Sequence, residues 1–136
     1  MSPSVYPEGA SAVVLCIDDS QDMLDCERAF LESFGYTVLT APNGGRGLEL
    51  ASLYSVDVVL LAYFMPRMNG QEVALELRRL RPQASIILIT DGAGVPDQTL
   101  NLVDALVAKE TLSSQLLPTI AEVYGCAQIR PATYDA

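Results

Sequence analysis

Short apolar runs and stretches with helical spacing alternate along the whole chain. Five runs rich in apolar residues cover, in order, 12–17, 36–40, 57–61, 85–90 and 105–108. The central runs are apolar at successive positions rather than at every second one, as expected for strands that are buried on both faces of a sheet. We therefore predict five β-strands.

The stretches between these strands have the periodicity of amphipathic helices. We predict helices over 20–34, 48–54, 71–80 and 112–124, and one or two helical turns over 99–103. In the first helix, Ser20 is the expected N-cap and Gly35 the stop. Its apolar side chains recur at steps of three and four and are expected to face the core: Met23, Cys26, Phe30 and Phe34. The glycine-rich segment 42–47 (PNGGRG) is predicted to be a turn. Its glycines could also suggest a phosphate cradle, but their spacing matches neither common phosphate-binding motif.

Alternation of strand and helix implies right-handed crossovers and a parallel sheet. The predicted fold is a three-layer α/β domain over residues 12–125, with helices on both faces of the sheet. Residues 1–11 and 126–136 are expected to be flexible termini, because neither segment has a pattern that continues the domain.

Composition narrows the classes of function. The chain has 136 residues and a net charge of −9, so binding to nucleic-acid phosphates is disfavoured. It has no histidine, which excludes imidazole bases and histidine metal sites. No apolar run reaches the roughly 18 residues of a membrane helix, and we expect a cytoplasmic protein without a membrane partner. Cys16, Cys26 and Cys126 form no CxxC pair and are interpreted as buried thiols in a reducing compartment.

Candidate chemistry gathers where the strands end, which is where open parallel sheets bind ligands. Asp18 and Asp19 follow the first strand, Thr90 ends the fourth, and Lys109 follows the fifth. Adjacent acids suit a hard divalent cation, and a hydroxyl with an ammonium suits phosphoryl oxygens. Each residue also has a plain structural interpretation: a helix cap, a strand-end threonine and a solvated lysine. The third strand ends at Ala62, which offers no reactive group.

Four segments resemble the receiver domain of bacterial two-component response regulators: LCIDDS, VVLLAYFMPRMNG, IILIT and LVAKE. The resemblance covers roughly residues 12–125, and the third-strand segment with its MPRMNG tail is the most specific. It implies the flavodoxin-like (CheY-like) fold, a five-stranded parallel sheet in the order 2-1-3-4-5.

The resemblance also implies roles for the residues at the strand ends. Asp18, Asp19 and the backbone carbonyl of Phe64 would hold Mg²⁺, while Thr90 and Lys109 would contact the phosphoryl group. In the family, a histidine kinase or phosphotransfer protein passes phosphate to an aspartate at the end of the third strand, and this position is Ala62. Binding of Mg²⁺ is therefore expected to be weak or absent. The chain is either a natural pseudo-receiver or an engineered Asp→Ala form, and the sequence leaves both open.

In such domains the downstream protein partner binds the face made by helix four, strand five and helix five. Here that region departs from the pattern: Leu106 replaces the usual aromatic residue, Glu110 replaces proline, and the segment between Thr90 and Lys109 is short. We expect a module that is not an enzyme and acts through protein contacts. Two alternatives are an adaptor with a vestigial site, and a flavodoxin-like flavin carrier, which the charges of Asp18 and Asp19 disfavour.

Overall fold

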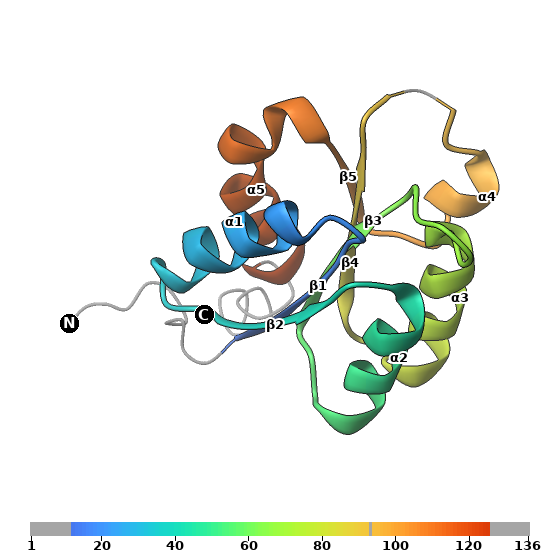
Figure 1. Cartoon of the computed structure of the whole chain (residues 1–136), viewed down its shortest axis with the longest axis horizontal. Helices are drawn as coiled ribbons and strands as arrows, with labels where there is room; N and C mark the ends of the chain where they lie inside the picture. Colours follow the sequence, from blue (N-terminus) through green and yellow to red (C-terminus); the bar gives the residue numbers. More distant parts are fainter. Residues whose placement is uncertain (1–11, 93, 126–136) are drawn as a thin grey trace, which may run out of the picture.

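A central parallel sheet forms the middle layer of the molecule, with helices on both faces (Figure 1). The structure, a computed structural model, describes residues 12–92 and 94–125. The sheet has five strands in the order β2-β1-β3-β4-β5, which confirms the predicted fold class. The strands are β1 (Val13–Ile17), β2 (Thr37–Ala41), β3 (Val58–Ala62), β4 (Ser85–Thr90) and β5 (Ala105–Ala108).

The helices lie on the two faces of the sheet in pairs. In Figure 1, α1 and α5 lie on one side, and α2 and α3 on the other, with α4 beside α3. Among the described residues, no helix has the length and apolar character that crossing a membrane requires. The bounds are α1 (Gln21–Glu32), α2 (Gly44–Leu53), α3 (Gly70–Leu80), α4 (Asp97–Leu100) and α5 (Leu112–Ile120), with a 3₁₀ turn η1 (Lys109–Thr111) and a π-helical turn η2 (Ala121–Gly125).

Alternate residues of β1, β3 and β4 enter two separate hydrophobic cores. On β1, Leu15 and Ile17 belong to the cluster that α2 and α3 cover, whereas Val14 and Cys16 belong to the cluster under α1 and α5. Every residue of β3 is buried. This double burial explains why the β3 sequence shows no polar alternation.

The helix α1 turns a different face to the core from the one predicted. Its buried residues are Leu24, Glu27 and Leu31, while Cys26 is exposed and Phe34 is 54% exposed. The prediction is wrong for Cys26 and Phe34, whereas Met23 and Phe30 are partly buried and Phe30 packs against the core. The fully buried stripe was missed because it contains a glutamate, which a search for apolar residues does not select. The buried thiol predicted for Cys16 is confirmed, and Cys126 lies outside the described residues.

The segment 42–47 is not a simple turn, because α2 begins inside it. The side chain of Asn43 accepts a hydrogen bond from the Arg46 N–H at 2.8 Å and caps the helix at Gly44. Gly44 and Gly47 are buried against Val73 and Ile17. Glycine is required at positions 44 and 47 because α2 packs too closely on the core to admit a Cβ there. The predicted turn is therefore wrong, and the segment contains the first turn of α2.

We expect Gly47→Ala to destabilise the fold and Gly45→Ala to stabilise it slightly. A Cβ at position 47 would lie 2.8 Å from Cγ1 of the fully buried Ile17, whereas one at position 45 meets only Asn43 Oδ1 at 3.5 Å. Overpacking of about 1–3 kcal/mol should exceed the helix-propensity gain of up to about 1 kcal/mol. Urea unfolding of both variants checks this, and equal stabilities would contradict the packing account.

Candidate functional site

The carboxyl ends of four strands bring the predicted residues to one edge of the sheet. In the parallel register, Ile17 pairs with Leu61, Ala62 with Ile89, and Thr90 with Ala108. The residues that follow these positions therefore share an edge, as the alternation of elements predicted. They are Asp18 after β1, Ala62 at the end of β3, Thr90 at the end of β4 and Lys109 after β5.

The two acids after β1 differ in their exposure to solvent. Asp18 is 3% exposed, and its Oδ1 accepts a hydrogen bond from the Ser20 N–H at 2.9 Å, while Oδ2 is buried without a partner. Burial raises the pKa of Asp18 and the nearby charge of Asp19 adds to this, although the Ser20 N–H and Lys109 act in the opposite direction. Asp19 is exposed.

A buried carboxyl oxygen without a partner is a poor arrangement for folding alone, but it suits a cation ligand. Asp18 Oδ2 therefore fits the predicted Mg²⁺ site, with Asp19 available beside it. The donor set is small, since no three Asp, Glu or Cys side chains within residues 12–92 and 94–125 converge as metal ligands. The metal roles of Asp18, Asp19 and the Phe64 carbonyl remain predictions.

The loop after β3 is held close to the sheet edge. The Tyr63 N–H donates to the Ile89 carbonyl at 2.9 Å, and the Gly70 N–H donates to the Tyr63 carbonyl at 2.9 Å. A Cβ on Gly70 would approach Tyr63 Cα to 2.9 Å, so the loop closes on α3 only with glycine there. This closure fixes Ala62 as a buried methyl at the strand end and leaves the Phe64 side chain exposed.

Thr90 and Lys109 complete this edge from β4 and β5. Thr90 is buried, and its hydroxyl exchanges hydrogen bonds of 3.3 and 3.4 Å with the backbone of Gly92. Lys109 begins η1 and is exposed; its backbone carbonyl accepts a hydrogen bond from the Leu112 N–H, and its ammonium makes no hydrogen bond or ion pair with the described residues. Its positive charge nevertheless lowers the pKa of Asp18 and of Glu27.

Glu27 is an ionisable residue of this region that we did not predict. It lies on the buried face of α1, is 3% exposed, and its Oε2 has no hydrogen-bond partner. Burial and the charge of Asp18 raise the pKa of Glu27 to about 7, opposed by the Cys16 thiol and Lys109. The available signal was its spacing, since Glu27 falls between Leu24 and Leu31 at steps of three and four.

The arrangement favours holding a cation and an anion side by side. Asp18 and Asp19 supply carboxylate oxygens, while Thr90 and Lys109 supply a hydroxyl and an ammonium for phosphoryl oxygens. A covalent phosphoryl intermediate requires a nucleophilic side chain, and the Ala62 methyl does not provide one.

Comparison with known proteins gives a consistent result. The family described as response regulator receiver domain matches residues 14–115. The transcriptional regulatory protein GlrR of Escherichia coli K12 is 31% identical over 86 residues, which are 63% of this chain but only 19% of GlrR. The matched segment is therefore less than a fifth of that relative's length.

Two solved structures share the fold over most of this chain. A CheY-like receiver domain protein from Methanospirillum hungatei JF-1 has a TM-score of 0.79 at 30% identity, covering 82% of this chain and 92% of its own. The response regulator TrrA of Thermotoga maritima, solved with Mg²⁺ and a beryllium fluoride, has a TM-score of 0.77 at 28% identity, covering 82% and 98%.

We expect the protein to lose stability as the pH rises from about 5 to about 8. Glu27 has a pKa of about 7 in the fold against an ordinary value of 4.5, so the folded state binds its proton more tightly than the unfolded state. The stabilising contribution is complete below about pH 4.5 and is lost through pH 7, with a loss on the order of 3 kcal/mol.

Glu27→Gln should remove most of this loss, because glutamine fills the same space without a titrating group. Urea unfolding at pH 5 and pH 8 measures the change in the free energy of unfolding between the two pH values. The pH dependence that persists in Glu27→Gln then includes the contribution of Asp18. Glu32→Gln is the matched control, since Glu32 lies exposed on the same helix beside Arg28. An unchanged pH dependence in Glu27→Gln would refute the assignment.

Proposed function

Because this chain belongs to the response regulator receiver family of two-component signalling, we propose that it is a pseudo-receiver, which transmits its signal by protein contacts without accepting phosphate. The observation that carries the proposal is the buried methyl of Ala62 at the end of β3. The hydrogen bond from the Gly70 N–H to the Tyr63 carbonyl closes the loop beside position 62. The side chain at that position, the Ala62 methyl, has no nucleophilic atom. In this proposal the protein is not an enzyme, and its residue 62 is either naturally alanine or an engineered replacement of aspartate.

In this proposal the surrounding residues keep their ability to bind ions. Asp18, Asp19 and the Phe64 carbonyl would hold Mg²⁺, which would neutralise the acids and position phosphoryl oxygens. Thr90 would offer its hydroxyl after giving up its bonds to Gly92. Without a carboxylate at position 62, the metal loses one negative ligand, so its affinity is low.

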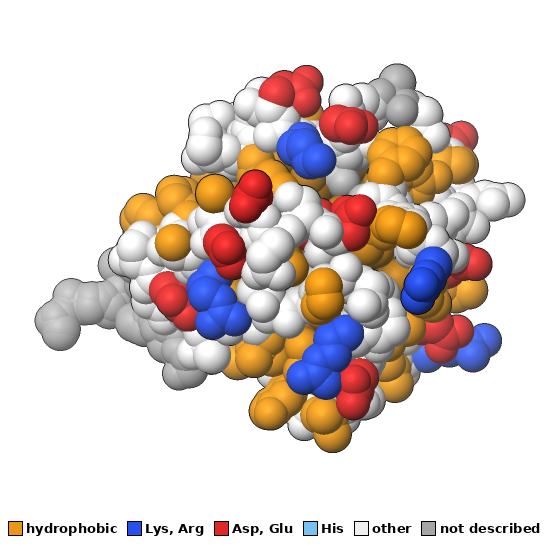
Figure 2. Space-filling model, in the orientation of Figure 1, with side chains coloured by type: hydrophobic (Ala, Val, Ile, Leu, Met, Phe, Trp, Pro, Cys, Tyr) orange, Lys and Arg blue, Asp and Glu red, His pale blue; other side chains and the backbone are white. Residues whose placement is uncertain are grey.

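The proposed partners are proteins. TrrA, the relative described above, has also been solved in complex with the histidine kinase ThkA, and we propose a histidine kinase or phosphotransfer protein as the input partner. The downstream partner would bind the α4, β5 and α5 face, where Leu106 is 47% exposed. Nucleic acid fits poorly with a net charge of −9, and basic side chains are scattered among acidic ones on the face in Figure 2. We place the protein in the cytoplasm.

A second candidate is an adaptor whose strand-end site is vestigial. It is favoured by the replaced residues of the output face, Leu106 and Glu110, and by the four-residue α4. The two candidates differ in whether a kinase still docks, which pull-down with candidate kinases decides. A flavin carrier is disfavoured, because Asp18 and Asp19 would repel the cofactor phosphate.

The chain should not be phosphorylated by acetyl phosphate with Mg²⁺, and Ala62→Asp should restore phosphorylation. The substitution supplies the missing nucleophile while the other predicted groups are already present. Intact-mass measurement detects one phosphoryl adduct per chain. A stoichiometric adduct on the unchanged chain would overturn the proposal, and an inert Ala62→Asp variant would favour the vestigial adaptor.

Without metal, the unchanged chain should melt at a higher temperature than Ala62→Asp. A third carboxylate about 6 Å from Asp18 would add repulsion of at most roughly 3 kcal/mol at an effective dielectric of about 20, which attraction to Lys109 offsets in part. The gap should close as Mg²⁺ is added, because the metal binds the variant more tightly. Thermal melts across a Mg²⁺ series test this; a more stable aspartate variant in EDTA would show that the electrostatic account is wrong.

A further inference from the structure

The segment 97–104, which contains α4 and leads into β5, has little intrinsic stability. Its helix has four residues, and its N-cap residue, Pro96, makes no side-chain hydrogen bond to it. Helices this short are unstable on their own, because nucleation costs more than a single turn returns. Contacts with the rest of the fold must therefore keep the segment in place.

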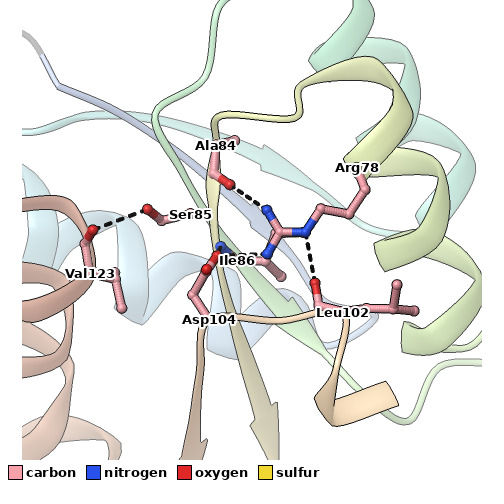
Figure 3. Close-up of polar contacts among 7 residues, drawn as sticks. All are labelled: Arg78, Ala84, Ser85, Ile86, Leu102, Asp104 and Val123. Carbon is pink, nitrogen blue, oxygen red and sulfur yellow. Dashed lines mark hydrogen bonds and ion pairs between the residues drawn. The ribbon is translucent and has the colours of Figure 1, made fainter. Parts of the chain in front are cut away.

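Arg78 on α3 binds this segment and the start of β4 together (Figure 3). Its Nε donates to the Leu102 carbonyl at 2.8 Å, and its two terminal nitrogens donate to the Ala84 carbonyl at 2.9 Å and to Asp104 Oδ2 at 2.8 Å. Asp104 Oδ2 also accepts a hydrogen bond from the Ile86 N–H at 2.8 Å. One guanidinium thus joins three parts of the chain through charge-assisted bonds, which are stronger than neutral ones.

Gln71 on α3 provides a second attachment, two helical turns before Arg78. The hydroxyl of Thr99, which is fully buried, donates to Gln71 Oε1 at 2.6 Å. The spacing of seven positions places Gln71 and Arg78 on the same side of α3. Leu102 and Val103 pack against the core cluster between these attachments.

We propose that Gln71 and Arg78 of α3 form a clamp that fixes residues 97–104 in one conformation, independently of the state of the strand-end site. The surface formed by α4 and β5, including Leu106, is then preformed. Its conformation does not depend on a rearrangement of Thr90. This agrees with Thr90 itself, whose hydroxyl bonds to Gly92 in its own loop and to no residue of the clamped segment. The inference rests on the hydrogen bonds of Gln71 and Arg78 and does not require the proposed function to be correct.

Hydrogen exchange of three backbone amides measures the opening of the segment. The N–H groups of Asn101, Leu102 and Asp104 donate to the carbonyls of Asp97, Thr99 and Ile86 at 2.8–3.0 Å. In Arg78→Gln these amides should exchange at least about tenfold faster, because the charged bonds that hold the segment are lost. The amides of β1, which lie far along the sheet, should change much less.

Arg79→Gln is the matched control. It removes the same charge from the next position of α3, where Arg79 only faces Glu76 at 3.8 Å in solvent. Exchange in this control should equal that of the unchanged chain. Thr99→Val, which removes only the bond to Gln71, gives a second measurement if Arg78→Gln fails to fold; it should accelerate exchange of the same amides.

The independence from the site is tested with Ala62→Asp, which changes the charge at the strand ends. Because this variant is expected to be less stable as a whole, the exchange rate of the three amides is compared with that of the β1 amides: the ratio of the two rates should be the same in Ala62→Asp as in the unchanged chain. The clamp is refuted if neither Arg78→Gln nor Thr99→Val accelerates exchange, or if acceleration is equal throughout the fold. A changed ratio in Ala62→Asp would refute the independence. Phosphorylation is not measured here, so failure of the proposed function would leave these results unaffected.

Discussion

The parallel pairing of β3 with β1 and β4 is the constraint on which the remaining structure depends. A parallel strand can be continued only through a crossover, so helices must cover both faces and every strand must end at the same edge. β3 lies in the middle, with all its residues buried. The pairing therefore places Ala62 between the ends of β1 and β4, and makes that position the centre of the site.

Two acids of this region, Asp18 and Glu27, are buried from water. Asp18 and Glu27 each keep one buried carboxyl oxygen without a partner, and both have raised pKa values because of burial. The positive charge of Lys109 offsets part of this cost, since it lowers the pKa of both acids. A third carboxylate at position 62 would increase the repulsion and also the attraction for a cation. In the proposed function, alanine at position 62 therefore lowers the affinity for a cation and also removes a source of repulsion from the metal-free protein.

The helix α3 connects the two loops that border the site. At its start, Asn69 and Glu72 form a reciprocal capping box, and Gly70 allows the loop after β3 to close on Tyr63. Further along, Gln71 and Arg78 hold the segment 97–104. One rigid helix therefore positions both the strand-end site and the surface beside it, so the geometry of each depends on how α3 packs against the sheet.

The sequence by itself determined the class of fold and the sheet edge at which the candidate residues lie. Contiguous apolar runs fixed β4 and β5 to the residue, and the order of strand and helix implied which residues share an edge. The capping role of Ser20 was also local, because it depends only on the next three residues.

Tertiary structure alone decided which face of α1 is buried. That face includes Glu27, a polar residue whose burial depends on the surrounding groups, among them Cys16 and Lys109. It likewise decided that α2 begins at Gly44. Gly44 and Gly47 pack against Val73 and Ile17, which are distant in sequence. The hydrogen bonds of Arg78 could not be predicted from the sequence either. Two of its three partners are backbone carbonyls, and every residue has one whatever its type.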